Sequence, residues 1–432
     1  PWMKTAGSVG DRPERLFSKQ LPITGRLVTW SPCHPVTGLA LALLLTLPAL
    51  WPLLRGGFFV SDDGLFHVYR TAALAEAWGQ GVLWPRLFPD FGFGYGQAVL
   101  NFYAPLSYIP AALLSVLGMN PATAVQVVIG LSILLAAAAA YGYGNFLFGP
   151  AGGVLAAVVY TYTPYHLADA YLRGAVPEHM AFIFPPLILW AFTAAFWPGR
   201  SGSSFILHPS SFDFKAPLLW GSLAWAALVL THNLTALLMM PVALLHLLVM
   251  AVWTGRWRRL GSAAGALLLA AWLSAFFWLP ALVESRAVGL SVGASAGYAN
   301  HMLTGATWLR RSVAFFLNPP ETLGPVFPLS WFALALVAAG TIALLRTLPS
   351  FRKDGNVARA TPLPLLGFHL AVAVGAMFMT TAASLFIWQP LTAILGQLQY
   401  PWRFLLLEAV GLMGVAAALP SLLPRRSRVD RV

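Results

Sequence analysis

Apolar stretches, each long enough to form a transmembrane helix, recur along this 432-residue chain from residue 38 to residue 423. A hydrocarbon core about 30 Å thick needs about 20 apolar residues per helical span. Helices satisfy their own backbone hydrogen bonds in lipid, where water cannot. Only 9% of the residues are charged, against roughly a quarter in an ordinary soluble domain. The sequence therefore predicts an all-α integral membrane protein.

The pattern predicts about ten transmembrane helices. They cover approximately residues 38–54, 121–144, 151–170, 178–197, 216–231, 234–253, 261–283, 324–345, 363–387 and 402–423. An eleventh apolar stretch, residues 104–118, is short for a span and contains Pro105 and Pro110.

The basic residues decide whether residues 104–118 cross the membrane. If they do not cross, the predicted inner segments hold 18 of the 26 Lys and Arg residues, as the positive-inside rule requires. If they do cross, most basic clusters fall outside. We therefore predict that residues 104–118 form an interfacial or re-entrant helix in a cell-membrane protein with both termini cytoplasmic.

This topology predicts a cytoplasmic tail over residues 1–36, a membrane domain over residues 37–423 and a basic tail over residues 424–432. Two predicted outer segments are long, residues 55–120 and residues 284–323. Long structured loops on one face of a bundle are where functional sites are usually built.

Charge and cysteine content exclude other classes. The net charge of +12 could indicate nucleic-acid binding, but the basic residues lie in short clusters between apolar spans. We therefore expect the lipid bilayer as a partner and no nucleic acid. The single Cys33 excludes an internal disulfide and a site with several cysteine ligands.

The first predicted outer segment carries a polar helical pattern. Asp63, His67 and Arg70 fall at i, i+4 and i+7 and share one face. An aspartate beside a histidine and an arginine can act as a general base or metal ligand near an anionic headgroup. Alternatively, Ser61 caps the helix and the acids favour its positive end, which explains Asp62 better than Asp63.

A second polar cluster lies at the predicted outer turn between the third and fourth spans. It contains Arg173 and Glu178, and acids at span ends are candidate site residues because charge there is costly. In the structural alternative, Pro177 and Glu178 begin a helix and Arg173 forms an ion pair with Glu178.

Further polar residues lie at predicted outer ends of spans: His232, Asn233, Glu284, Tyr400 and Arg403. Each alone is often structural, and aromatic residues there are typical of the membrane interface. Together they indicate a site because distant parts of the chain place them on one predicted face.

Several of these stretches resemble one bacterial family of multi-span proteins. The stretches are residues 61–70, 91–96, 101–106, 171–174 with Glu178, 231–235 and 400–403. The family carries the label 6-pyruvoyl-tetrahydropterin synthase-related membrane protein and is similar to the C-type glycosyltransferase (GT-C) superfamily. The resemblance covers about residues 38–423. No soluble pterin-enzyme pattern is visible in the sequence, so the label does not imply pterin chemistry.

The resemblance implies a catalytic acid just after the first span, followed by juxtamembrane helices. In the family pattern one aspartate precedes the histidine by four residues, which corresponds to Asp63, whereas Asp62 stands where a histidine or another polar residue is more usual. Similar enzymes use a lipid-phosphate-linked sugar. Their aspartate deprotonates the acceptor or binds a divalent cation, Mg²⁺ or Mn²⁺.

The resemblance also implies roles for the other clusters. Arg173 and Arg403 would hold the donor phosphate, and Glu178 and His232 would line the pocket or ligate a metal, with Asp63 and Glu178 as its candidate ligands. The remaining predicted substrate-binding residues are His67, Arg70, Asn233, Glu284 and Tyr400.

The predicted function is therefore sugar transfer from a polyprenyl-phosphate-linked donor to an acceptor at the outer face of the membrane. One alternative is a transporter or lipid flippase, which would place polar residues near mid-membrane. Glu408, inside the last span, fits that alternative unless it pairs with Arg403. Another alternative is a non-catalytic scaffold with the same fold.

Overall fold

The computed structural model describes residues 34–197, 215–285, 297–304, 331–353 and 362–422. Nearly all of the predicted N-terminal tail, most of the second long predicted segment and the predicted C-terminal tail lie outside these residues. Within them every regular element is a helix, and extended pairing is limited to two isolated bridges. The all-α prediction is confirmed for the described residues.

Five helical stretches are long and apolar enough to cross a membrane: Pro35–Leu54, Pro121–Phe148, Val176–Phe196, Asn233–Thr254 and Pro401–Ser421. A sixth arises if Arg258–Leu273 and Ala275–Glu284, bent by 69°, form one span. Four shorter apolar helices are Pro150–Tyr162, Lys215–Thr231, Trp331–Arg346 and Leu363–Met379. Each of the ten predicted stretches overlaps one of these helices, but within the described residues five or six meet the length and composition of a span. The count of ten stays a prediction.

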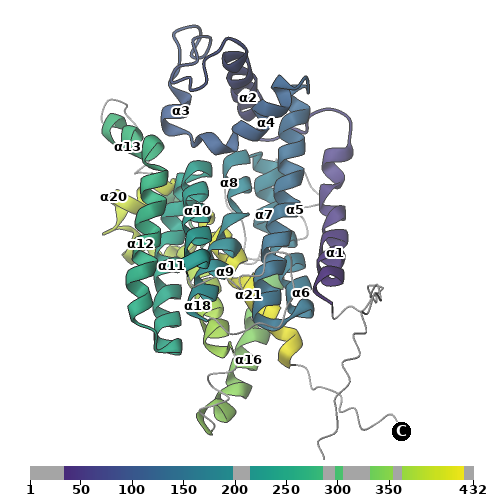
Figure 1. The fold of residues 1–432 in the computed structure, drawn as a ribbon, viewed down its shortest axis with the longest axis vertical. Helices are drawn as coiled ribbons and strands as arrows, with labels where there is room; N and C mark the ends of the chain where they lie inside the picture. Colours follow the sequence, from purple (N-terminus) through teal and green to yellow (C-terminus); the bar gives the residue numbers. More distant parts are fainter. Residues whose placement is uncertain (1–33, 198–214, 286–296, 305–330, 354–361, 423–432) are drawn as a thin grey trace, which may run out of the picture. The chain divides into compact units, whose positions relative to one another are not determined.

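Most of the helices of the bundle lie side by side in Figure 1, and Ala275–Glu284 turns away from Arg258–Leu273. Their bounds are α1 (Pro35–Thr46) with η1 (Leu47–Leu54), α5 (Pro121–Phe148), α6 (Pro150–Tyr162), α9 (Phe184–Phe196), α10 (Lys215–Thr231), α11 (Asn233–Thr254), α12 (Arg258–Leu273), α13 (Ala275–Glu284), α16 (Trp331–Lys353), α18 (Leu363–Met379) and α21 (Leu405–Leu422). Small residues allow close packing of α21 on α18, since a Cβ at Gly411 would lie 2.5 Å from the backbone nitrogen of Ala373.

The third predicted span, residues 151–170, is wrong in its extent. Helix α6 ends at Tyr162 because Pro164 has no N–H to continue the helical hydrogen bonds. The chain continues as α7 (Pro164–Ala168), the π-helical turn η3 (Asp169–Arg173) and α8 (Val176–Ala181). Such π turns occur frequently at functional sites.

The ninth predicted span, residues 363–387, is also too long. Helix α18 ends at Met379 and two short helices follow, η8 (Ala382–Ser384) and α19 (Leu385–Trp388). The hydroxyls of Thr380 and Thr381 donate to carbonyl oxygens three residues back, which favours an end to the helix at this point.

The segment 55–120 folds into short helices at one end of the bundle, uppermost in Figure 1. They are α2 (Gly64–Gly79), α3 (Val99–Phe102), η2 (Pro105–Ser107) and α4 (Ile109–Val116). Helix α4 has only 8 residues, too few to span a bilayer, as expected if residues 104–118 do not cross. It packs on α2 and α5, while α3 contacts α13.

Candidate functional site

Two polar clusters that are far apart in the sequence meet through their backbones. The amide of Asp62 donates to the carbonyl oxygen of Leu172 at 3.1 Å, and the amide of Asp63 donates to that of Arg173 at 2.7 Å. The residues just before α2 therefore pair with the end of η3. This pairing fixes the Asp63 backbone beside Arg173.

Gly174 makes this close approach possible. Its φ of +63° lies in the left-handed region, which glycine adopts without steric cost. A Cβ at this position would lie 2.5 Å from Ser61 Oγ and 2.9 Å from the backbone nitrogen of Gly64. No other residue fits there without displacing the segment that carries Asp63.

Asp63 occupies the N-cap position of α2, but its side chain does not cap the helix. The alternative in which Ser61 caps the helix is therefore wrong. Within the described residues, the half-buried Asp63 carboxylate makes no hydrogen bond or ion pair. Asp62 is more exposed than Asp63, although the loss of some of its hydration and the neighbouring Asp63 raise its pKa. Asp63 is thus the better placed of the two acids for chemistry.

His67 and Arg70 meet at the hydroxyl of Tyr108. His67 Nδ1 and Arg70 Nη1 each lie 3.0 Å from Tyr108 Oη, and the Arg70 guanidinium lies 3.9 Å from the ring centroid of Tyr103. Burial and the nearby Arg70 lower the pKa of His67 to about 3. Because Arg70 can only donate to Tyr108, the Tyr108 proton is available for a neutral His67 Nδ1.

Arg173 forms the centre of a buried ionic group. Its Nη1 donates to Tyr165 Oη at 3.0 Å, to Glu178 Oε2 at 2.8 Å and to Asp169. Tyr165 in turn donates to Glu178 Oε1 at 2.6 Å, and Arg403 Nε lies 3.6 Å from Glu178 Oε2. The alternative ion pair between Arg173 and Glu178 is therefore present, buried rather than exposed. The group thus brings together two guanidinium groups and two carboxyl groups.

Arg403 differs from Arg173 in how its guanidinium is used. Both residues are 8% exposed. Among the described residues, Arg403 Nη1 has no hydrogen-bond partner, while Arg173 Nη1 serves three oxygens. Of the two arginines, Arg403 therefore retains buried donors that could bind an anion.

His232 and Tyr400 lie beside this ionic group. His232 Nδ1 is 2.7 Å from Thr235 Oγ1. Burial lowers the pKa of His232 to about 3, a shift that the nearby carboxylate of Glu178 opposes. Tyr400 stacks on Trp402, and its ring centroid lies 5.9 Å from the Arg403 guanidinium.

Asn233 and Glu284 do not join the ionic group. Asn233 is exposed, and its side chain accepts a hydrogen bond from the next backbone N–H. The carboxylate of Glu284, at the end of α13, is instead bound by Arg86 and Asn101 at the edge of a separate cavity.

The arrangement does not form a recognisable metal site. Within the described ranges, no group of three or more His, Cys, Asp or Glu side chains is placed to hold a metal ion. The carboxylate of Glu178 already accepts hydrogen bonds from Arg173 and Tyr165. A divalent cation held by Asp63 and Glu178 therefore stays a prediction.

Four residues of the site were given no predicted role, although Tyr165 and Asp169 lie in the second polar cluster and Tyr103 in one of the resembling stretches: Tyr103, Tyr108, Tyr165 and Asp169. The spacing of Asp169 four residues before Arg173 is a usable helical signal. The two tyrosines of the first loop carry no such signal, because Tyr108 lies in a stretch that reads as apolar.

The fold defines an all-helical, multi-pass membrane protein with a polar site at one end of its bundle. No family model matches the chain. An uncharacterized protein of Lactococcus lactis subsp. cremoris (strain MG1363) is 23% identical over 257 residues, which cover 57% of this chain and 39% of that protein.

A similar solved structure is the Archaeoglobus fulgidus oligosaccharyltransferase in its apo form. It matches with a TM-score of 0.46 and 14% sequence identity, over 90% of this chain and 50% of that chain. The chain thus matches half or less of the length of both proteins.

Proposed function

We propose that this chain is a GT-C-type glycosyltransferase that transfers a sugar from a polyprenyl-phosphate-linked donor to an acceptor at the outer face of the membrane. The observation that carries the proposal is the position of Asp63. Its carboxylate has no partner among the described residues, while its backbone is bonded to Arg173 beside a buried group of charges. The sequence resemblance described above supports the same reaction.

The proposed reaction uses Asp63 as the base and Arg403 as the group that stabilises the leaving phosphate. Asp63 accepts the proton of an acceptor hydroxyl as its oxygen attacks the anomeric carbon of the sugar. The bond from that carbon to the lipid phosphate breaks, and the phosphate leaves with the electron pair. Donors held in a preorganised, buried site stabilise such developing negative charge. Arg403 supplies these donors, since its Nη1 has no partner in the described part of the chain.

Arg173 and Tyr108 act as positioning residues. The carbonyl of Arg173 holds the backbone of Asp63, and its guanidinium holds the two carboxylates of the ionic group. Tyr108 ties His67 and Arg70 of α2 to the start of α4. These contacts fix the orientation of α2 and so help to position Asp63 at its start.

The test is sugar transfer by the purified full chain in lipid, from a panel of radiolabelled polyprenyl-phosphate donors, with and without Mg²⁺ or Mn²⁺. Asp63→Asn should abolish transfer, because the amide cannot accept the proton. Asp90→Asn, an exposed position in the same segment, is the matched control and should leave transfer unchanged. Transfer that survives Asp63→Asn would refute the assignment.

One observation favours a transporter or flippase instead. Glu408 lies 3% exposed inside α21, and its Oε1 has no hydrogen-bond partner among the described residues. The pairing with Arg403 considered from the sequence is absent, because the ion pair of Arg403 within these residues is with Glu178. Buried carboxyls in membranes often mark transport pathways. Lipid scrambling that is lost in Glu408→Gln and intact in Asp63→Asn would establish this second function.

A further inference from the structure

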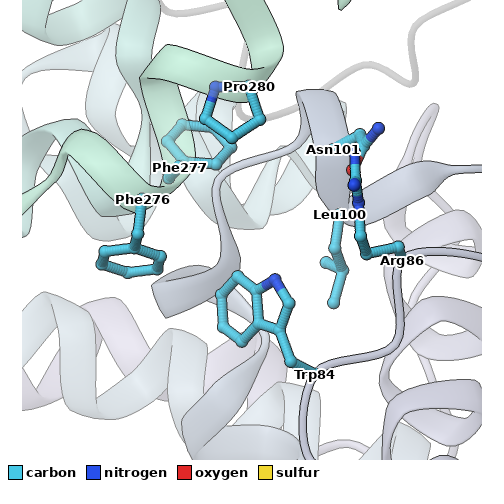
Figure 2. A pocket seen from close by; sticks show the side chains of 7 residues that line it. All are labelled: Trp84, Arg86, Leu100, Asn101, Phe276, Phe277 and Pro280. Carbon is cyan, nitrogen blue, oxygen red and sulfur yellow. The ribbon is translucent and has the colours of Figure 1, made fainter.

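A cavity of about 340 Å³ lies between the first loop segment and the bent helix pair α12 and α13, near the low end of the size range of small-molecule sites. It is lined by Trp84, Arg86, Leu100, Asn101, Phe276, Phe277 and Pro280. Figure 2 shows that Phe276, Phe277 and Pro280 face the other four residues across the cavity. Two stretches far apart in sequence therefore build it.

Arg86, Asn101 and Glu284 form a hydrogen-bonded network at one edge of this cavity. Arg86 Nε donates to Asn101 Oδ1 at 3.0 Å, and Arg86 Nη2 donates to Glu284 Oε1. Asn101 Nδ2 donates to the other carboxylate oxygen of Glu284. This network joins the loop, α3 and α13. The side chains of Arg86 and Glu284 are still 56% and 38% exposed, so both donors and acceptors remain accessible.

Aromatic rings from both sides line another part of the cavity. The rings of Trp84 and Phe276 meet edge to face, with centroids 5.4 Å apart and an interplanar angle of 72°. Trp84 is 41% and Phe276 is 54% exposed. The negative face of an aromatic ring attracts polarised C–H groups. The cavity therefore combines flat aromatic surface with hydrogen-bond donors and acceptors.

This combination selects the ligand chemistry. Arg86 is already paired with Glu284, so this pair offers a phosphate no net positive charge, and an aliphatic chain would leave the polar edge unused. A hydroxyl group both donates and accepts, so a ring carrying several hydroxyls can use Arg86, Asn101 and Glu284 together. We propose that this cavity binds a saccharide ring. The proposal rests on the proposed function, because the cavity would be the subsite for a sugar ring of one of the substrates of that reaction.

The test is photo-crosslinking of the full chain in lipid nanodiscs with a neutral hexoside that carries a diazirine, followed by peptide mapping. A diazirine-bearing isoprenyl alcohol without sugar is the second probe. The hexoside should label residues 84–101 and 276–284 and be displaced by unlabelled hexoside. Both Trp84→Ala and Glu284→Gln should weaken this labelling roughly tenfold, since each removes a ligand contact.

Trp272→Ala is the matched control, because this exposed tryptophan on α12 does not line the cavity. It should leave labelling unchanged, as should Asp63→Asn, because labelling needs no turnover. Labelling by a wild-type chain that transfers no sugar would show that the proposed function fails while this inference stands. Labelling of the cavity by the isoprenyl probe alone, or by neither probe, would overturn the saccharide assignment.

Discussion

The backbone amide of Asp63 lies 2.7 Å from the carbonyl oxygen of Arg173 and donates a hydrogen bond to it. Through this contact the first residues of the loop segment are held by the turn that carries the buried ionic group. The position of the proposed base therefore depends on the local geometry of η3 and Gly174.

Gly174→Ala should disrupt this contact. The left-handed conformation costs a residue with a Cβ roughly 1–2 kcal/mol, and the new Cβ would also collide with Ser61 and Gly64. Sugar transfer should fall strongly and the thermal midpoint should drop. Gly118→Ala is the control, with a φ of +97° but no atom within 4 Å of the added Cβ. If both variants lose transfer equally, backbone strain alone explains the effect.

Arg173→Gln and Arg403→Gln should separate stability from activity. Arg173→Gln leaves Asp169 and Glu178 without their principal counter-charge, and breaking a buried ion pair costs about 3–5 kcal/mol. Among the described residues Arg403→Gln removes one ion pair of 3.6 Å and the cation–π contact with Tyr400, so it should unfold close to wild type and yet lose transfer. Denaturant unfolding and transfer assays check this pair. Equal destabilisation of both variants would contradict it.

Stability should fall as the pH drops below about 6.5. His67 has a pKa of about 3 in the folded chain, against about 6.5 in the unfolded chain. Between these two pH values the unfolded chain binds a proton at His67 and the folded chain does not. The loss between pH 6.5 and pH 5 is about 2 kcal/mol for one such histidine. His232 contributes in the same direction. His67→Gln should therefore remove about half of the fall in unfolding free energy that these two histidines cause.

The charge-derived topology makes a separate prediction about sidedness. On a Cys33→Ser background, Asp90→Cys should react with a membrane-impermeant maleimide in intact cells. Arg258→Cys should react only after permeabilisation, because residues 254–260 are predicted to be cytoplasmic. Both positions are exposed. If Arg258→Cys reacts in intact cells and Asp90→Cys reacts only after permeabilisation, the site lies on the inner face.

Local sequence was sufficient for the helical class and for the positions of the main apolar helices. Runs of apolar residues require a helical backbone in lipid, whatever the neighbours are. The distribution of basic residues predicted that the stretch 104–118 does not cross, and its helix α4 has only 8 residues. The ends of helices were harder to predict, as the interruption at Pro164 shows.

The partners of the polar residues were decided only by tertiary structure. Arg173 and Arg403 look alike in the sequence, but packing surrounds one with three acceptors and leaves the other with an unused donor among the described residues. Glu284 was predicted together with Glu178, and the fold places it with Arg86 and Asn101 instead. A hydrogen bond depends on distance and direction between side chains from different helices, and the order of residues along one chain does not contain that information.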